Sequence, residues 1–409
     1  MTDDIENRDI AGAAANPANP APDPSAAPDD SIDLTSIHQP VLLDDCVDLV
    51  TSNLAASAAT HGGTPVIVDC TLGLAGHSSA FLAANPDARL IGIDRDAEAL
   101  ALATRRLEQA GFADRFTPVH AAFDELGAVL ERLGIHQVDA VFMDLGLSSL
   151  QIDETDRGFS YSHDAPLDMR MDPSQPTTAA DILATYDAAD LRRIFKEYGE
   201  ERFAGPIAQR IVRERQEAPI VTSAQLNDLV DRTVPRAHRA SGNPAKRVFQ
   251  ALRIEVNGEL DKLASTLPQA ALRLAVGGRL VVESYHSLED RTVKRFMAKG
   301  LTIDAPAGLP VVPDDAQPFF HDVTHGAIKA DDAEIASNPR SASVRLRAVE
   351  LIRPIPASRR RELADDAAGP GADGTRTPGT ARRRAGRPGG GHGRSAGHRT
   401  QHHERTTGR

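Results

Sequence analysis

The chain has 409 residues, of which 41% are hydrophobic, and its formal net charge is −12 at pH 7. This hydrophobic content supports a packed core, and the negative charge excludes a protein whose whole surface is basic for nucleic-acid binding. No apolar run approaches the roughly 18 residues of a membrane span, and the acidic N-terminus is unlike a signal peptide. Two cysteines are too few for a disulfide framework or a zinc cluster, so we expect a soluble cytoplasmic protein.

The two ends of the chain differ in composition from the body between them. Residues 1–36 are rich in Ala, Pro, Asn and Asp and hold few large apolar groups, which predicts a disordered acidic arm. Residues 357–409 are rich in Arg, Gly and His, which is typical of a disordered basic tail. Any nucleic-acid binding would therefore be local to part of the body or come from this tail.

Within the body, short apolar strands alternate with amphipathic helices, which predicts an α/β fold with a mostly parallel sheet covered by helices. We expect strands at 66–70, 89–94, 116–121 and 138–146, with a helix after each of the first three. The alternation then stops for about 100 residues of loop and helix. It resumes with a helix near 259–275, a strand at 279–285, a helix near 288–299 and a strand at 344–352.

The interruption has a helical pattern of its own. Apolar side chains from Leu191 to Tyr198 follow the spacing of one helix face, and Thr222 with Gln225 forms a capping box before another such face. We therefore predict an inserted helical subdomain at 153–250. Insertions after the strands of an open parallel sheet commonly build the substrate side of the ligand cleft.

Two candidate binding features follow the first two strands. The segment VDCTLGLAG turns through Gly73 and Gly76 into a helix, and glycines at such a turn let backbone N–H groups approach a ligand closely. Asp94 ends the second strand, where a carboxylate can accept both hydroxyls of a ribose. The glycine spacing is not G-x-G-x-x-G, so a nicotinamide cofactor fits poorly. An ordinary tight turn with a solvated acid is the alternative.

A candidate reaction centre lies at Asp144, which closes the fourth strand and is followed by Ser148, Ser149 and Gln151. Acceptors at this place could hold the N–H bonds of an amine that is to be alkylated and align its lone pair with the electrophile. An Asx turn capped by the serines explains the segment equally well.

The segment SYHSLEDRTVKRF leads from a strand into a helix. Ser287 with Asp290 predicts a capping box, and Glu289 complements the positive end of the helix dipole. Neither role accounts for His286, which we expect to point from the strand end toward the cleft. A lone histidine is, however, more often structural than catalytic.

Two further segments could contact a nucleic acid. In 157–172 a flipped base could stack on Phe159, although a packed loop with an ion pair between Arg170 and Asp168 is the better explanation. In 243–260 the cations Lys246, Arg247 and Arg253 could follow a phosphate backbone or simply form a solvated helix face.

With these segments placed, the sequence closely resembles the bacterial 16S rRNA (cytosine-N4)-methyltransferase family over about residues 38–352. The blocks that carry the resemblance are HQPVLLDDCV, VDCTLGLAGHSS, GIDRDAEAL, FMDLGLSSLQID, RGFSYSHDAPLDMRMD, YGEERFAGPIAQRIV, FQALRIEVNGEL, SYHSLEDRTVKRF and NPRSASVRLR. Blocks of this length in this order are far more specific than one glycine loop.

The resemblance implies a class I, Rossmann-like methyltransferase whose core comprises 37–152 and 251–356, with the helical subdomain at 153–250 recognising the substrate. It implies methyl transfer from S-adenosylmethionine to N4 of a cytidine in the decoding region of 16S rRNA within the small ribosomal subunit. The reaction that the resemblance implies requires no metal and no membrane, and the resemblance is compatible with a homodimer.

The resemblance also implies roles for individual residues, carried over by motif. The expected cofactor contacts are Ala75, Gly76 and His77 in the loop, Asp94 at the ribose, Phe123 at the adenine, and Asp144 and Gln151. For catalysis we expect Asp144 as the principal acceptor, assisted by His286 or Glu289. The chain departs from the family pattern at Ala75, usually Gly, which predicts crowding at the cofactor. It also departs at Tyr285, usually Phe, and at Ala342, usually Arg, where a phosphate contact is in doubt.

Two rival functions remain open at this point. The first is an rRNA-binding assembly factor that keeps the cofactor fold without turnover, which the intact DLGLSS and SYHSLEDR blocks argue against. The second is a methyltransferase for DNA or for another RNA, which only mapping of the methylated base distinguishes.

Overall fold

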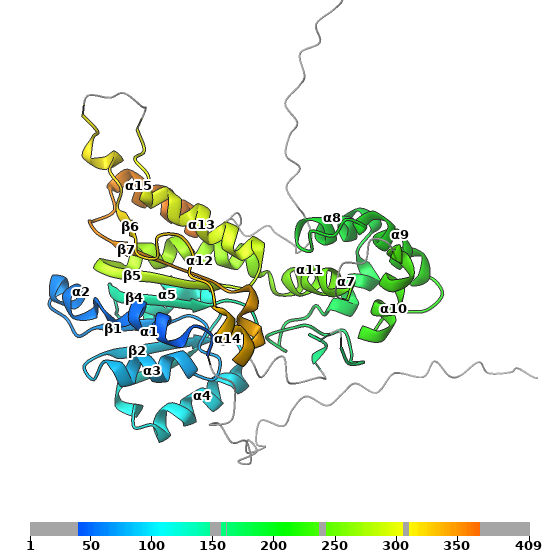
Figure 1. The fold of residues 1–409 in the computed structure, drawn as a ribbon, viewed down its shortest axis with the longest axis horizontal. Coiled ribbons are helices and arrows are strands. Elements are labelled where there is room, and N and C mark those ends of the chain that lie inside the picture. The colour runs from blue at the N-terminus through cyan, green and yellow to red at the C-terminus, as the bar shows by residue number, and fades with distance from the viewer. Residues whose placement is uncertain (1–39, 148–156, 161, 237–242, 306–310, 369–409) are drawn as a thin grey trace, which may run out of the picture.

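The computed structural model describes residues 40–147, 157–160, 162–236, 243–305 and 311–368. At its centre lies a seven-stranded sheet with strand order β3-β2-β1-β4-β5-β7-β6 (Figure 1). The strands are β1 (Val66–Asp69), β2 (Arg89–Asp94), β3 (Phe116–His120), β4 (Val138–Asp144), β5 (Leu274–Ser284), β6 (Phe320–Asp322) and β7 (Arg345–Leu351). Neighbours from β3 to β5 pair in parallel, and β7 pairs antiparallel with β5 and β6. The predicted mostly parallel α/β sheet is confirmed.

Helices pack on both faces of this sheet. One face packs against α1 (Leu43–Thr51), α2 (Leu54–His61), α3 (Gly76–Ala84) and α4 (Ala97–Gln109). The other packs against α5 (Leu126–Arg132), α12 (Glu259–Arg273), α13 (Ser287–Leu301) and α15 (Ala357–Ala367). Shorter pieces are α14 (Asp332–Ser337) and the 3₁₀ turns η1 (Ala113–Arg115), η2 (Phe123–Glu125), η5 (Asp314–Ala316) and η6 (Pro339–Ser343).

Burial on two faces explains why the central strands read as continuous apolar runs. In β1, Ile67 packs in the cluster beneath α1 and α3, whereas its neighbour Val68 packs in the cluster beneath α5 and α12. Successive side chains of a strand point to opposite faces, so a strand covered on both sides needs an apolar residue at every position. The carboxyl ends of these strands are then free to carry polar groups.

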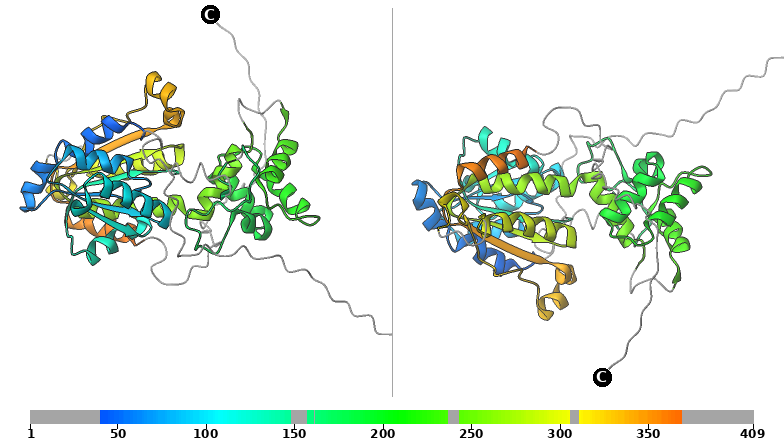
Figure 2. Two further views of the ribbon diagram at one scale, coloured as in Figure 1. Left: turned by 90° about the horizontal axis from the view of Figure 1, so that it is seen from below. Right: turned by 90° about the horizontal axis from the view of Figure 1, so that it is seen from above.

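The interruption forms a separate helical part, as predicted. Its helices are α7 (Ala179–Thr185), α8 (Ala188–Glu197), α9 (Ala204–Glu214), α10 (Ser223–Thr233) and α11 (Lys246–Asn257), and they share a hydrophobic cluster of their own. Figures 1 and 2 show this part set apart from the sheet and its covering helices. Thr222 caps α10 in a capping box with Gln225, as expected. The part extends further than expected, because α11 crosses the predicted boundary at 250 and ends at Asn257.

One residue joins the helical part to α12. Gly258 ends α11 and starts α12 with a positive φ of 61°, a conformation that favours glycine. The Arg253 guanidinium spans this joint and holds both oxygens of Glu259 at 2.9 Å. The Asn257 side chain accepts from the Met171 N–H at 2.9 Å and donates to the Met169 carbonyl at 2.8 Å. Side-chain hydrogen bonds therefore hold the joint both to the start of α12 and to the segment at Met169 and Met171.

The end of the described chain differs from the expected tail. Residues 357–367, expected to be disordered, form α15, whose Leu363 is buried in the core cluster. Ion pairs hold this helix to the body, among them Arg359 with Asp304 at 2.7 Å and Lys299 with Asp366 at 2.7 Å. The rest of the predicted tail and the predicted arm, 369–409 and 1–39, lie outside the described residues. Among those that are described, no helix has the length and apolar character to cross a membrane.

Candidate active site

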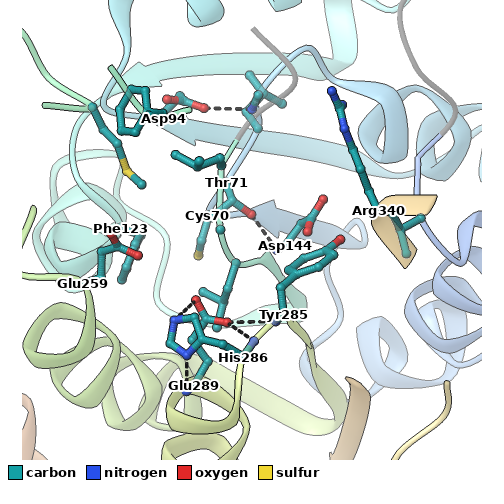
Figure 3. Close-up of a pocket in the computed structure, with 18 of the residues that line it drawn as sticks. Cys70, Thr71, Asp94, Phe123, Asp144, Glu259, Tyr285, His286, Glu289 and Arg340 are labelled. Atoms are coloured by element: carbon teal, nitrogen blue, oxygen red, sulfur yellow. Dashed lines mark hydrogen bonds and ion pairs between the residues drawn. The ribbon is translucent and has the colours of Figure 1, made fainter. Parts of the chain in front are cut away.

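A pocket of about 500 Å³ lies at the carboxyl ends of the parallel strands, lined from both the sheet and the helical part (Figure 3). The sheet side contributes Asp94 and Asp144, and α11 contributes Arg253. Arg340, in η6, reaches the pocket from the C-terminal part of the chain. This is the place where open parallel sheets bind ligands.

The loop after β1 is tied directly to the end of β2. Asp94 accepts the Gly73 N–H at its Oδ2 and the Asp96 N–H at its Oδ1, both at 2.8 Å. Burial raises the pKa of Asp94 above its ordinary value, although these two N–H groups favour the ionised form. Each carboxylate oxygen keeps a further lone pair, so Asp94 can still accept from two hydroxyls in the pocket.

The three expected contacts at the start of α3 have different surroundings. Ala75 has a positive φ of 58° and is fully buried in the core cluster. The sequence predicts that its side chain crowds the pocket, but in the structure this side chain packs in the core instead. Gly76 lines the pocket, and a Cβ there would come within 2.6 Å of Pro40. The buried ring of His77 lies 2.9 Å, through Nε2, from the Val41 carbonyl oxygen.

Asp144 is the polar group at the end of β4. Its backbone N–H donates to the Thr71 hydroxyl at 2.7 Å, which fixes the turn, and its side chain is 31% exposed. Asp144 Oδ2 lies 3.8 Å from His77 Nδ1. Burial raises the pKa of Asp144 to about 6, the Tyr285 hydroxyl opposes this shift, and the charge of Glu289 adds to it. At neutral pH Asp144 is thus an ionised acceptor with a substantial proton affinity.

The start of α13 differs from the expected capping box of Ser287 with Asp290. His286 is the cap residue, because its Nδ1 accepts the Glu289 N–H at 3.3 Å. Glu289 Oε2 in turn accepts the N–H groups of Tyr285 and His286, at 2.8 and 3.1 Å. The carboxylate of Asp290 instead holds Arg347 at 2.7 Å.

His286 and Glu289 both line the pocket, so the expectation that His286 faces the cleft is met by the structure. Glu289 is buried, and burial would raise its pKa, but contact with His286 and the charge of Arg253 hold the pKa below its ordinary value. His286 Nε2 lies 3.0 Å from Glu289 Oε1. Oε2 of the ionised Glu289 is thus held by two backbone N–H groups, whereas the contact of His286 Nε2 with Oε1 lacks hydrogen-bond geometry.

The remaining predicted site residues divide into three cases. Phe123 lines the pocket at the start of η2 (Figure 3). Gln151 lies outside the described residues. Arg170 and Asp168 form the ion pair of the packed-loop alternative, at 2.7 Å, so this arginine already has a carboxylate partner. Glu259 and Arg340 line the pocket without having been singled out, because nothing in their local spacing predicts where their side chains point. Tyr285, noted from the sequence only as a departure from the family pattern, lines the pocket as well.

The residues present fit a nucleoside-containing ligand. Asp94 offers paired acceptors for a diol, and the loop from Leu72 to Gly76 offers backbone at close range. Phe123 and Leu263 supply apolar surface next to them. A site of this composition matches the adenosine part of S-adenosylmethionine.

The strand order and the pocket at the strand ends define an α/β protein of the Rossmann-like class. Within that class, the chain belongs to the MraW methylase family, whose model matches residues 35–352. It is therefore a methyltransferase.

Several curated relatives are similar over most of their length. A protein named ribosomal RNA small subunit methyltransferase H from Bifidobacterium longum (strain NCC 2705) is 72% identical over 338 residues, covering 83% of this chain and 92% of its own length. Proteins of the same name are 70% identical in Bifidobacterium adolescentis and 55% identical in Beutenbergia cavernae. These matches cover 81% and 78% of this chain, and 95% and 94% of those proteins.

Among solved structures, an rRNA methylase from Streptococcus thermophilus aligns with 76% of this chain and 94% of its own. The TM-score of this alignment is 0.30 and the sequence identity is 12%.

Proposed function

We propose that this protein transfers a methyl group from S-adenosylmethionine to N4 of a cytidine in the decoding region of 16S rRNA. The substrate is the small ribosomal subunit in the cytoplasm. The names of the curated relatives support an rRNA of the small subunit as the substrate. The observation that carries the chemistry is the carboxylate of Asp144, open to the pocket and placed across the Thr71–Gly76 loop from Asp94.

The cofactor would be held by the groups that the pocket already orients. The Gly73–Gly76 backbone would border it, Asp94 would accept the ribose hydroxyls, and Phe123 would lie against the adenine. Gln151, outside the described residues, would complete this set. When bound, S-adenosylmethionine supplies an electrophilic methyl group on a sulfonium.

The protein's own contribution to the reaction is an acceptor at the right place. The exocyclic amine of cytosine is a poor nucleophile because its lone pair is delocalised into the ring. Asp144 accepts one of its N–H bonds, which localises the lone pair, and takes the proton as the new N–C bond forms. A pKa of about 6 suits this role, because Asp144 is ionised at neutral pH yet binds a proton well.

His286 and Glu289 assist from the floor of the pocket. Two backbone N–H groups hold Glu289 Oε2, and the negative charge of Glu289 raises the pKa of Asp144. At the mouth, Lys246 from α11 and Arg340 from η6 line the pocket and would contact phosphates that flank the target nucleotide.

Substitution of Asp144 by Asn tests this chemistry. The side chain keeps its shape but gains a donor in place of one acceptor, so the amine loses its alignment. We expect single-turnover methylation to fall about 100-fold or more, roughly 2.7 kcal/mol of transition-state stabilisation. S-adenosylmethionine binding by calorimetry and thermal unfolding serve as controls for the fold. A near-normal rate would move the acceptor role away from Asp144.

The substrate is tested by mapping the product. The enzyme is incubated with labelled S-adenosylmethionine and small subunits from a strain that lacks this enzyme, and the labelled nucleotide is identified. We expect N4-methylcytidine in the decoding region. A label on another base, on naked DNA or on another RNA would identify the rival methyltransferase, and binding to subunits without any label would identify the assembly factor.

A further inference from the structure

Two neighbours of Asp144 favour opposite protonation states of its carboxyl group. His77 Nε2 lies 2.9 Å from the Val41 carbonyl oxygen, and because a carbonyl can only accept, Nε2 must carry the proton. Burial lowers the pKa of His77, so the ring is neutral and its Nδ1 is a bare acceptor. Nδ1 lies 3.8 Å from Asp144 Oδ2. Two acceptors that face one another favour a proton between them, so His77 favours the protonated form of Asp144.

Tyr285 favours the ionised form. Its ring packs against the backbone that follows Asp144, since a Cβ at Gly146 would lie 3.4 Å from the Tyr285 ring. The hydroxyl points toward the Asp144 carboxylate (Figure 3), and its interaction with that carboxylate lowers the pKa of Asp144. Burial and the nearby carboxylates raise the pKa of Tyr285 well above its ordinary value. The hydroxyl therefore keeps its proton and can act as the donor.

Among the described residues, the other titratable groups around Asp144 do not donate a hydrogen bond to its carboxylate. Burial raises the pKa values of Glu283 on β5 and Cys46 on α1, and neither group contributes a hydrogen bond to Asp144. Asp69, at the end of β1, accepts from Ser78 at 2.6 Å. Glu289 on α13 is ionised and disfavours a second charge on Asp144.

We propose that the Tyr285 hydroxyl is a positioning group that holds Asp144 as an ionised acceptor at neutral pH, against the opposing preference of His77. The inference rests on the proposed function, in which Asp144 takes the proton of the substrate amine. Once that proton has moved from the amine nitrogen to Asp144, His77 Nδ1 is the acceptor that matches the protonated carboxyl. A hydrogen bond between them requires the two atoms to approach by about 1 Å. The two neighbours thus serve the states before and after proton transfer.

The substitution that tests this role removes a single oxygen atom. Phe is the residue usual in the resembling family, so Tyr285→Phe keeps the ring that packs on Gly146. Tyr186→Phe is the matched control, because the Tyr186 hydroxyl also donates to a carboxylate, Glu255 at 2.8 Å, but does so in the helical part and outside the pocket.

The first measurement is the pH dependence of single-turnover methylation of small subunits. A donor to a charged carboxylate contributes about 1.5 kcal/mol or more, so its loss should move the acid limb of the rate profile about one pH unit upward. At pH near 6 the Tyr285→Phe rate should fall roughly fivefold below wild type, with little change at pH 8.5. Tyr186→Phe should keep the wild-type profile. An acid limb that stays in place in Tyr285→Phe overturns the proposal.

The second measurement does not depend on the reaction. The infrared carbonyl band of a protonated carboxyl, taken as the difference between wild type and Asp144→Asn without cofactor, reports the titration of Asp144. Its midpoint should move upward in Tyr285→Phe. It should move downward in His77→Gln, whose amide can still donate to Val41 but has no atom at the Nδ1 position.

The two measurements separate the two proposals. Unchanged midpoints overturn the role of Tyr285, whatever base is methylated. Shifted midpoints together with a methylated base other than a cytidine overturn the proposed function and leave the role of Tyr285 standing.

Discussion

Asp94 ends β2 and Asp144 ends β4, on either side of β1 in the sheet, yet the surroundings of the two carboxylates differ. Asp94 is held by two backbone N–H groups of the loops beside it, which fixes its orientation toward the pocket. Within the described part of the chain, the Asp144 side chain is not held by such a pair and faces His77 and Tyr285 instead. A fixed acceptor suits binding of a ligand, and an acceptor whose protonation is finely balanced suits proton transfer.

Asp94→Ala tests the binding role. The variant leaves two ligand hydroxyls without their shared acceptor and also frees the Gly73 N–H, so the loop loses its tie to β2. Loss of a charged hydrogen bond costs about 1.5–3 kcal/mol, which is a tenfold or greater rise in the dissociation constant. Calorimetry of S-adenosylmethionine binding measures this. Unchanged affinity in a folded variant would remove Asp94 from the cofactor site.

The buried carboxyl group of Glu283 should make the stability of the protein depend on pH, which is a second prediction at the residue scale. It is fully buried, and neither oxygen has a hydrogen bond of ordinary geometry within the described part of the chain. Burial raises its folded-state pKa well above the ordinary value, so its contribution to stability is present at low pH and is lost as the pH rises. Glu283→Gln does not titrate and should be the more stable protein at pH 8.

The measurement is the difference in melting temperature between Glu283→Gln and wild type at pH 5 and at pH 8. We expect the difference to grow by a few degrees between the two. Glu131→Gln, which removes a largely exposed partner of Arg273, should change little at either pH. A difference for Glu283→Gln that is the same at both pH values would show that Glu283 keeps its charge state throughout.

At the scale of elements, the start of α13 shows how one local interaction serves both fold and site. His286 caps the helix and Glu289 closes the capping box, and both side chains line the pocket. His286→Asn retains a good capping group but removes the imidazole, whereas His286→Ala removes both. If capping is the main role, His286→Ala should lose about 1 kcal/mol of unfolding free energy and His286→Asn much less. Chemical denaturation measures this.

Methylation rates of the same two variants separate the capping role from a catalytic one. A role in capping alone predicts that His286→Asn retains most of the wild-type rate. A large loss of rate in His286→Asn at full stability would instead make the imidazole a direct participant.

The sequence predicts the elements best where burial imposes a pattern. The strands from 66 to 144 are found within two residues of the expected positions. The cause is clearest for the central strands, whose two faces are both covered and whose residues are therefore mostly apolar. The helix α15 was missed because it buries little more than Leu363 and is otherwise charged. The capping box was misplaced by one residue because Ser287–Asp290 and His286–Glu289 are both plausible by spacing, and the choice depends on tertiary contacts.

The site was predicted less completely than the fold, for a related reason. Asp94, Asp144 and His286 could be found because they follow strands, and strand ends meet at one edge of the sheet. Ala75 faces the core and the Tyr285 hydroxyl faces Asp144 only because of how the loops turn, which spacing does not encode.

At the scale of the whole molecule, the charge distribution raises the question of how an acidic body meets RNA. Truncation after Ala368 removes nine Arg and two acidic residues and keeps α15 in place. We expect weaker binding to small subunits at low salt and a flatter salt dependence, because fewer counterions are released from phosphates. S-adenosylmethionine affinity and the methylated base should stay unchanged.

Filter binding over a range of salt concentrations measures this effect. Truncation after Ile352 is a poor substitute, because it also removes α15 and its ion pairs with the body. If the variant ending at Ala368 keeps the salt slope of the full chain, the tail is passive. The contacts must then be sought first at Lys246, since Arg253 is already paired with Glu259.

Because Gly258 joins α11 to α12, a change in its backbone angles would rotate α11 about this residue. Since α11 begins at Lys246 and ends beside the joint, its 12 residues form an arm about 18 Å long. A rotation of about 10° at Gly258 therefore carries Lys246 through about 3 Å, whereas Arg253 and Asn257, close to the pivot, barely move. The width of the pocket mouth is thus far more sensitive to the backbone angles of this one glycine than the geometry around Asp144 is.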